Sequence, residues 1–178
     1  MYEELDEVVR LLRSRGVAHA LIGAAAMAGL GVVRASDDLD LLVVDPAVLQ
    51  QSFWKPLGRT MAVDVRAGDD ADPLAGVVRL SPSRGMPIDV VVGKRAWNRD
   101  VIARARPIRI GPVDVPLVGA ADLVVLKLYA GGAQDAADVR LILSVVDRDA
   151  VSAEVDARVA SLPPESVELW RRIAAEPS

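Results

Sequence analysis

Apolar residues follow two different spacings along this chain. Up to about residue 118, short apolar runs bounded by Gly, Pro and Asp alternate with segments of helical periodicity, which is typical of strands alternating with helices. From Gly119 onward, the apolar residues recur at helical spacing alone. We therefore predict an α/β core over residues 1–118 and a helical C-terminal part over residues 119–178, packed together around a cleft.

The same patterns assign the individual elements. Predicted strands cover residues 17–22, 39–44, 61–66, 77–80 and 88–92 and a short pair within 108–115. Predicted helices cover residues 2–15, 24–30, 46–57, 95–105, 119–130, 134–147, 149–160 and 164–175. Two of the strands, 39–44 and 88–92, carry an aspartate inside an apolar run, and these two are the informative ones.

Composition narrows the class of protein. The chain has 178 residues, of which 52 % are hydrophobic and 26 % charged, which excludes intrinsic disorder. The lack of cysteine removes disulfides and thiol chemistry, and the single histidine, His19, rules out a histidine-rich metal site. The net charge of −4 argues against a broad nucleic-acid-binding surface. The apolar runs are too short for a bilayer and the N-terminus begins acidic, so we expect a soluble cytoplasmic protein with no membrane contact.

Asp38 and Asp40 lie at the start of the strand 39–44. Residues two apart in a strand point to the same face, so the two carboxylates should lie side by side, with Leu39 and Leu41 on the opposite face. Like charges this close repel unless a cation lies between them, and Mg²⁺ prefers oxygen ligands of this kind. The alternative is a solvated loop in which the aspartates are turn residues.

Asp89 stands alone in the apolar run 88–92. A charged residue in such a run is rarely buried without a partner. If the strands that hold Asp40 and Asp89 are neighbours, three carboxylates converge, which is enough for one or two divalent ions. The alternative is that Asp89 faces solvent on a half-exposed sheet.

Two further segments carry weaker signals. Gly23 and Ala24 follow a predicted strand at a small-residue turn, where backbone N–H groups are free to bind phosphate oxygens. The stretch from Lys94 to Arg109 holds six basic residues against one acidic residue, Asp100. Such a stretch either guides RNA or a nucleotide or is a solvated helix face.

The Gly23-Ala24 turn and the aspartate motif together resemble the signature of the polymerase-beta-like nucleotidyltransferase superfamily. In that signature, a Gly followed by Gly or Ser precedes a spacer and an Asp-hydrophobic-Asp motif; here Gly23-Ala24 is followed by thirteen residues and then by Asp38-Leu39-Asp40. The local form Arg34-x-Ser36-x-Asp38-Leu39-Asp40 is similar to that of AbiEii-type and related toxin nucleotidyltransferases. Asp89 stands where the third carboxylate of such proteins is expected.

The resemblance continues into the C-terminal part and covers about residues 15–145. Lys127, in an apolar helix, and Asp135 and Asp138, at the start of the next helix, are similar to the lysine-bearing helix and the Asp-x-x-Asp helix start of that group. The residues alone give a related interpretation: Asp135 and Asp138 lie near the core-facing side of their helix, and a pairing of Lys127 with either Asp138 or Asp135 would satisfy both partners. Alternatively, Lys127 meets a phosphate or reaches solvent as a surface lysine, and Asp135 only caps its helix.

The resemblance implies a nucleotidyltransferase-like mixed sheet with flanking helices and the transfer of NMP from an NTP, with ATP or CTP as donor, to an acceptor hydroxyl. The implied catalytic and metal-binding residues, for Mg²⁺ or Mn²⁺, are Asp38, Asp40 and Asp89. The implied nucleotide-binding residues are Gly23, Ala24, Arg34, Ser36, Lys127, Asp135 and Asp138. The implied acceptor is RNA, at the 3′ end of tRNA, and the implied partner is a cognate antitoxin protein of a toxin–antitoxin or phage-defence pair.

Two alternatives to this function stay open at the level of sequence. The same chemistry can act on a small molecule such as an antibiotic, or on a protein hydroxyl. A degenerate fold can also serve as an inactive nucleotide-binding module. An acidic acceptor site would favour a cationic small molecule, whereas a basic rim would favour RNA.

Overall fold

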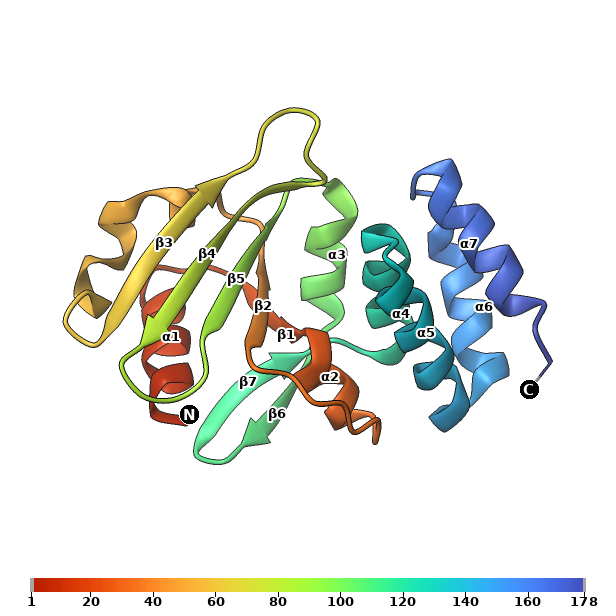
Figure 1. Ribbon diagram of the computed structural model, residues 1–178, viewed down its shortest axis with the longest axis horizontal. Coiled ribbons are helices and arrows are strands. Elements are labelled where there is room, and N and C mark those ends of the chain that lie inside the picture. Colours follow the sequence, from red (N-terminus) through yellow and green to blue (C-terminus); the bar gives the residue numbers. More distant parts are fainter. Residues whose placement is uncertain (1, 178) are drawn as a thin grey trace. The chain divides into compact units, whose positions relative to one another are not determined.

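The computed structural model describes residues 2–177, which form two compact units (Figure 1). The first unit contains the chain up to Ala25 and Ala35–Val118, and the second contains Ala26–Arg34 and the chain from Gly119 onward. The first unit is built on a seven-stranded sheet in the order β3-β4-β5-β2-β1-β7-β6. The mixed sheet, its flanking helices and the helical C-terminal part confirm the predicted fold class.

The strands of the sheet are β1 (His19–Ile22), β2 (Leu39–Val43), β3 (Met61–Ala67), β4 (Leu74–Pro82), β5 (Ile88–Gly93), β6 (Arg106–Ile110) and β7 (Val113–Leu117). Strand β2 pairs with β1 in antiparallel and with β5 in parallel orientation, while β3, β4 and β5 form an antiparallel meander. Each predicted strand is present. Strand β4 begins three residues before and ends two residues after the predicted strand 77–80.

The two faces of β4, β5 and β2 differ in burial, as strand alternation dictates. One face presents Val78, Val90 and Leu41, which are all fully buried. The other face presents Arg79 and Asp89, which are half-buried. The charged residues of these strands therefore share the open face, and the apolar residues of the opposite face build the core.

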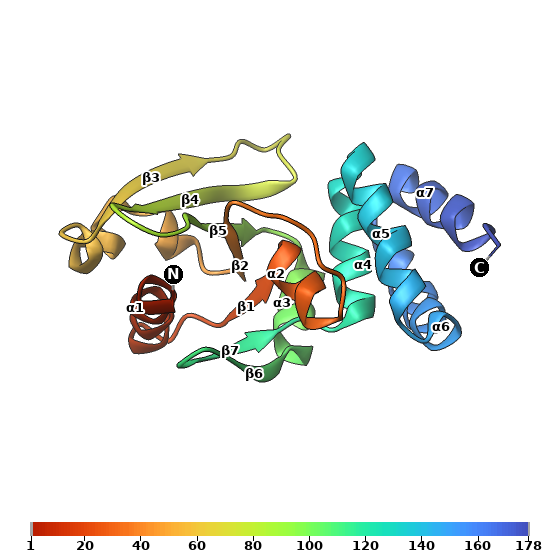
Figure 2. The same ribbon diagram turned by 60° about the horizontal axis from the view of Figure 1, so that its bottom comes forward.

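Helices α1 (Tyr2–Ser14) and α3 (Ala96–Arg104) lie on the same side of the sheet, against its apolar face (Figure 2). The stripe of α1 that faces the core consists of Leu5, Val8, Val9, Leu11 and Leu12.

The helix expected over residues 46–57 is not an α-helix; it is divided into two 3₁₀ segments, η1 (Pro46–Leu49) and η2 (Gln51–Leu57). Gln50 between them is extended, and Pro56 has no N–H to donate, so a continuous i→i−4 ladder cannot form.

The second unit is a helical bundle. Its helices are the end of α2 (Gly23–Gly29), α4 (Ala120–Ala130), α5 (Ala133–Val145), α6 (Arg148–Val159) and α7 (Pro164–Ala174). Helix α4 packs against α5, α6 and α7, and its residues Leu123, Val124 and Leu128 are buried. Trp170 of α7 is buried as well, and its Nε1 donates a 2.6 Å hydrogen bond to Asp156 of α6.

Within residues 2–177, no helix is both long enough and apolar enough to cross a membrane.

Candidate active site

Four charged side chains form one row across the open face of the sheet. The strand register pairs Asp64 of β3 with Arg79 of β4, Arg79 with Asp89 of β5, and Asp89 with Asp40 of β2. Residues in register on adjacent strands point to the same face, so the row runs Asp64, Arg79, Asp89, Asp40. The condition set by the sequence is met, because the strands of Asp40 and Asp89 are direct neighbours.

Asp89 is more enclosed than Arg79 and Asp64 in this row. Only 17 % of its side chain is exposed, and Arg79 Nη1 lies 2.8 Å from its Oδ2. Its Oδ1 is buried and has no hydrogen-bond partner among residues 2–177. Burial, reinforced by the charge of Asp38, raises the pKa of Asp89 above that of an ordinary aspartate, and Arg79 opposes this shift only in part.

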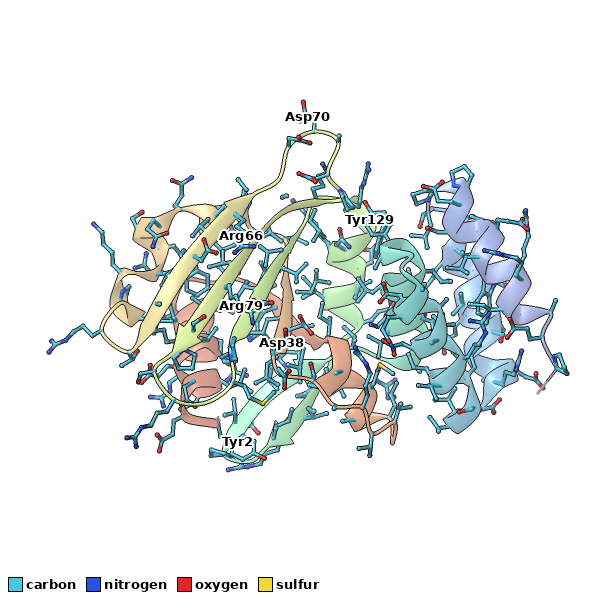
Figure 3. All side chains as sticks on the ribbon, viewed as in Figure 1. Tyr2, Asp38, Arg66, Asp70, Arg79 and Tyr129 are labelled. Atoms are coloured by element: carbon cyan, nitrogen blue, oxygen red, sulfur yellow. The ribbon has the colours of Figure 1, made fainter. Side chains whose placement is uncertain are left out.

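Asp38 reaches the row from the segment that precedes β2. Its Oδ1 accepts a 2.7 Å hydrogen bond from Ser36 Oγ, and its Oδ2 lies 3.8 Å from Arg79 Nη1. The labelled side chains of Asp38, Arg79 and Arg66 all lie on the near face of the sheet in Figure 3. Asp38 and Asp89 therefore share Arg79 as a counter-charge. The hydroxyl of Ser36 orients the Asp38 carboxylate.

Gly23 brings the backbone directly against the Asp40 carboxylate. It has φ +64°, and a Cβ built on it would lie 2.0 Å from Asp40 Oδ2 and 2.8 Å from its Cγ. Both the left-handed conformation and the lack of space require glycine at this position. The turn thus fixes where the Asp40 carboxylate can lie. The next residue, Ala24, is buried.

The donors present suit a hard divalent cation. Carboxylate oxygens are the ligands such cations prefer, the buried Asp89 Oδ1 has no hydrogen-bond partner, and the close approach of Gly23 holds Asp40 beside Asp89. As the side chains stand, no group of three or more His, Cys, Asp or Glu residues among residues 2–177 converges on one ion position. The expected convergence of three carboxylates is therefore incomplete: Asp40 and Asp89 are adjacent, and Asp38 meets Asp89 only through Arg79.

A pocket opens beside Asp89 on the same unit. Its volume is ≈ 350 Å³, and strands β3 and β4 with the loop that joins them supply its walls. Arg66, Asp72, Arg79 and Asp89 are the charged residues that line it. A molecule in this pocket would have direct access to Asp89.

The remaining charged residues of the expected site form a separate cluster in the second unit. Lys127 Nζ of α4 lies 2.9 Å from Asp135 Oδ1 and 2.7 Å from Asp138 Oδ2 of α5, and Gln134 Nε2 donates to Asp138 Oδ1. Asp138 is fully buried. The expected pairing of Lys127 is thus present with both aspartates, and Asp135 also caps its helix by accepting from Gly132 N–H.

Hydrogen bonds and opposite charges within this cluster stabilise the charged forms of Lys127 and Asp138. Burial alone would lower the pKa of Lys127, but the hydrogen bonds and charges of Asp138 and Asp135 outweigh it and raise that pKa. Burial alone would raise the pKa of Asp138, but Lys127, Gln134 and Arg34 together lower it. Arg34 Nη1 lies 3.5 Å from Asp138 Oδ2. Within the second unit, the partner of Arg34 is therefore Asp138.

Two residues of the basic stretch from Lys94 to Arg109, Lys94 and Arg99, contact groups outside the carboxylate row. Arg99 of α3 lines a second pocket, of ≈ 590 Å³, together with His19 and Val44. His19 is in register with Val43, so it points to the apolar face and away from Asp40. Lys94 Nζ donates to the carbonyls of Asp69 and Asp70 in the β3–β4 loop. Arg99 and the row thus lie on opposite faces of the sheet.

Sequence reasoning missed Arg79. The signal was present, because Arg79 is a single charge in the apolar run of β4, as Asp89 is in that of β5. The sequence does not give the strand register, and only the register shows that Arg79 and Asp89 are cross-strand partners.

Comparison with known proteins identifies the family. The chain matches, over residues 1–172, the family described as "Nucleotidyl transferase of unknown function (DUF2204)". The chain belongs to the DUF2204 nucleotidyltransferase family. No curated protein sequence matches it.

Solved structures share the fold of this DUF2204 protein. ANT(2″)-Ia in complex with adenylyl-2″-tobramycin aligns with a TM-score of 0.57 at 15 % identity, covering 87 % of this chain and 94 % of that one. A nucleotidyltransferase from Thermotoga maritima aligns with a TM-score of 0.55 at 14 % identity, covering 80 % and 92 %. The lincosamide antibiotic adenylyltransferase LnuA, bound to lincomycin, aligns with a TM-score of 0.51 at 12 % identity, covering 82 % and 98 %. At these identities the likeness concerns the fold.

Proposed function

We propose that this DUF2204 protein transfers NMP from an NTP to an acceptor hydroxyl, with Asp38, Asp40 and Asp89 as its catalytic residues. The observation that carries this proposal is the adjacency of Asp40 and Asp89, with Asp38 linked to Asp89 through Arg79, on the open face of a nucleotidyltransferase-like sheet. Like charges are costly to hold together, and a fold that places them there needs a cation to balance them. If Arg79 alone neutralised these carboxylates, the buried Asp89 Oδ1 would have no partner.

Asp38, Asp40 and Asp89 are the proposed ligands of Mg²⁺ or Mn²⁺, with Asp89 on the side of the acceptor. When bound, such an ion stabilises the negative charge that develops on the attacking and leaving oxygens. Gly23 fixes the Asp40 carboxylate, and Ser36 orients that of Asp38. The backbone N–H groups after β1 are the proposed contacts to the triphosphate.

Asp89 is the proposed general base. Its raised pKa makes it a better proton acceptor than an ordinary aspartate, and its Oδ1 has no competing hydrogen bond among residues 2–177. In the step, the acceptor oxygen bonds to the α-phosphorus and the bond from that phosphorus to the bridging oxygen breaks. Pyrophosphate leaves, the NMP ester forms, and the hydroxyl proton passes to Asp89.

Two acceptor classes follow from different observations. The resemblance to AbiEii-type toxin nucleotidyltransferases favours the 3′ end of tRNA, with a cognate antitoxin as partner. The geometry gives better support to a small molecule, since the pocket beside Asp89 has the size typical of small-ligand sites and Arg99 lies on the opposite face. The ligands named for ANT(2″)-Ia and LnuA, an adenylylated tobramycin and lincomycin, are of this class.

An acceptor screen separates these classes. The protein is incubated with each of the four α-labelled NTPs and Mg²⁺, in turn with total RNA, with an aminoglycoside and lincosamide panel, and with cell protein. Label on a small molecule supports an acceptor that binds in the pocket beside Asp89. Label on RNA supports the tRNA acceptor that the family resemblance implies. If Asp40→Asn transfers label as well as the parent does, the carboxylates are not the catalytic residues.

A further inference from the structure

Arg79 is a cation already placed where the carboxylates need one. Its Nη1 lies 2.8 Å from Asp89 Oδ2 and 3.8 Å from Asp38 Oδ2, and it is the register partner of Asp89 on the adjacent strand. A guanidinium at hydrogen-bond distance neutralises a carboxylate without any metal. The side chains among residues 2–177 thus stand in an arrangement in which Arg79 offsets part of the negative charge and in which no three carboxylates converge on one ion position.

A divalent ion and the Arg79 guanidinium cannot both occupy this place at low cost. Metal-to-carboxylate oxygen distances are about 2.0–2.6 Å for Mg²⁺ and Ca²⁺, so an ion on Asp89 would lie within a few ångströms of Nη1. Two positive charges at that separation repel strongly, and the enclosure of Asp89 weakens the screening by water. Metal binding by Asp89 therefore favours a movement of Arg79 away from it.

The fold offers Arg79 another place. Its side chain is 40 % exposed and lines the ≈ 350 Å³ pocket. On the other side of it in the cross-strand row lies Asp64, which is its register partner on β3. Asp64 is 54 % exposed and pairs with Arg66, at 2.7 Å. A turn of the Arg79 side chain away from Asp89 therefore leads to a second carboxylate and to open space.

We propose that Arg79 is an exchangeable internal counter-ion: it holds Asp89 and Asp38 when no metal is present, and it releases Asp89 when a divalent cation binds. This inference rests on the proposed function, because it takes the three carboxylates as the metal site. Arg79 is thus a positioning residue that competes with the metal and sets its affinity. When released, it turns toward Asp64 and changes the wall of the pocket in which the acceptor is proposed to bind.

Calorimetric titration with Mn²⁺, in the absence of nucleotide, tests this competition. The variants are Arg79→Gln and Arg79→Met, which both remove the charge, while Met retains an unbranched apolar side chain of similar length. Arg79→Lys keeps a positive charge at the same position. Arg66→Gln is the comparison variant: Arg66 lies on the same face and pairs with Asp64, and its charge acts on Asp89 without a hydrogen bond to it. Melting temperatures measured in EDTA show that each variant is folded.

Removal of the Arg79 charge should lower the Mn²⁺ dissociation constant tenfold or more. Arg79→Lys should stay within threefold of the parent, as should Arg66→Gln. A parent that does not bind Mn²⁺ measurably, while Arg79→Gln or Arg79→Met does, also supports the competition.

Two results overturn the inference. If the parent binds Mn²⁺ and both charge-removing variants bind it equally or more weakly, Arg79 does not compete with the metal, and the proposed function stands without it. If neither the parent nor these variants bind Mn²⁺, the metal site itself fails, and with it the proposed function.

Discussion

Alanine substitutions at two glycines, Gly23 and Gly16, separate the cost of a backbone conformation from the cost of a displaced carboxylate. Both glycines have left-handed φ angles, +64° and +69°. A Cβ on Gly16 would meet nothing within 4 Å, whereas one on Gly23 would lie 2.0 Å from Asp40 Oδ2. Gly16→Ala is therefore a matched control that carries the conformational penalty alone.

The expected magnitudes follow from these contacts. A non-glycine residue in the left-handed region costs about 1–2 kcal/mol, and this applies to both variants. In Gly23→Ala, Asp40 must also leave its rotamer or the turn must shift, which adds about 0.5–1.5 kcal/mol. Displacement of a catalytic group by about 1 Å can lower the rate roughly 100-fold, so we expect a loss of that order for Gly23→Ala and none for Gly16→Ala.

Urea unfolding and NMP transfer, measured on both variants and the parent, test this expectation. Gly23→Ala should be the less stable variant and should bind Mn²⁺ more weakly than Gly16→Ala. The reasoning is refuted if the two variants lose equal stability and Gly23→Ala retains parental transfer, because the turn would then not fix the Asp40 carboxylate.

The remaining predictions concern four charged residues. Asp40→Asn should abolish transfer while the melting temperature in EDTA stays level or rises, since like-charge repulsion is relieved; lower stability with retained activity would make Asp40 structural. Asp89→Asn should lower the rate of the chemical step more than NTP affinity, in a single-turnover assay, and equal rates would remove Asp89 from the mechanism. Lys127→Met should cost about 2–4 kcal/mol of unfolding free energy in urea titrations, because it leaves Asp138 buried beside Asp135 with a weaker counter-charge. The pKa of Asp138 is lowered in the fold, so its stabilisation is present above the ordinary aspartate pKa of about 3.9 and is lost as the pH falls below it; urea titrations at pH 5 and pH 3 should show a smaller loss for Asp138→Asn than for the parent.

Hydrophobic spacing was sufficient to predict an α/β core followed by a helical C-terminal part, whereas the nucleotidyltransferase-like mixed sheet was predicted from the family resemblance. The strands β2 and β5 were recognisable as apolar runs, and each aspartate within them was unusual enough to mark a site. Helical spacing also suggested a pairing of Lys127 with Asp138 or Asp135 as one alternative, and the structure shows Lys127 paired with both.

Other features depend on long-range register, which spacing alone does not encode. Arg79 faces Asp89 only because β4 and β5 pair with a particular offset, and a shift by one residue would place it on the apolar face. Likewise, Arg34 precedes the aspartate motif in sequence, yet its partner within the second unit is Asp138, more than one hundred residues later. The division of residues 46–57 into 3₁₀ segments depends on the extended Gln50, which no periodic pattern marks.

The most direct test of the central claim is NMP transfer by the parent and by Asp40→Asn under identical conditions. Each protein is given α-labelled NTP, Mg²⁺ and the acceptor found in the screen, and an EDTA control is run beside it. We expect labelled product from the parent with Mg²⁺, none with EDTA, and at least a 100-fold lower rate for a folded Asp40→Asn. Equal rates for the two proteins, or full transfer by the parent in EDTA, would contradict nucleotidyl transfer at this carboxylate site.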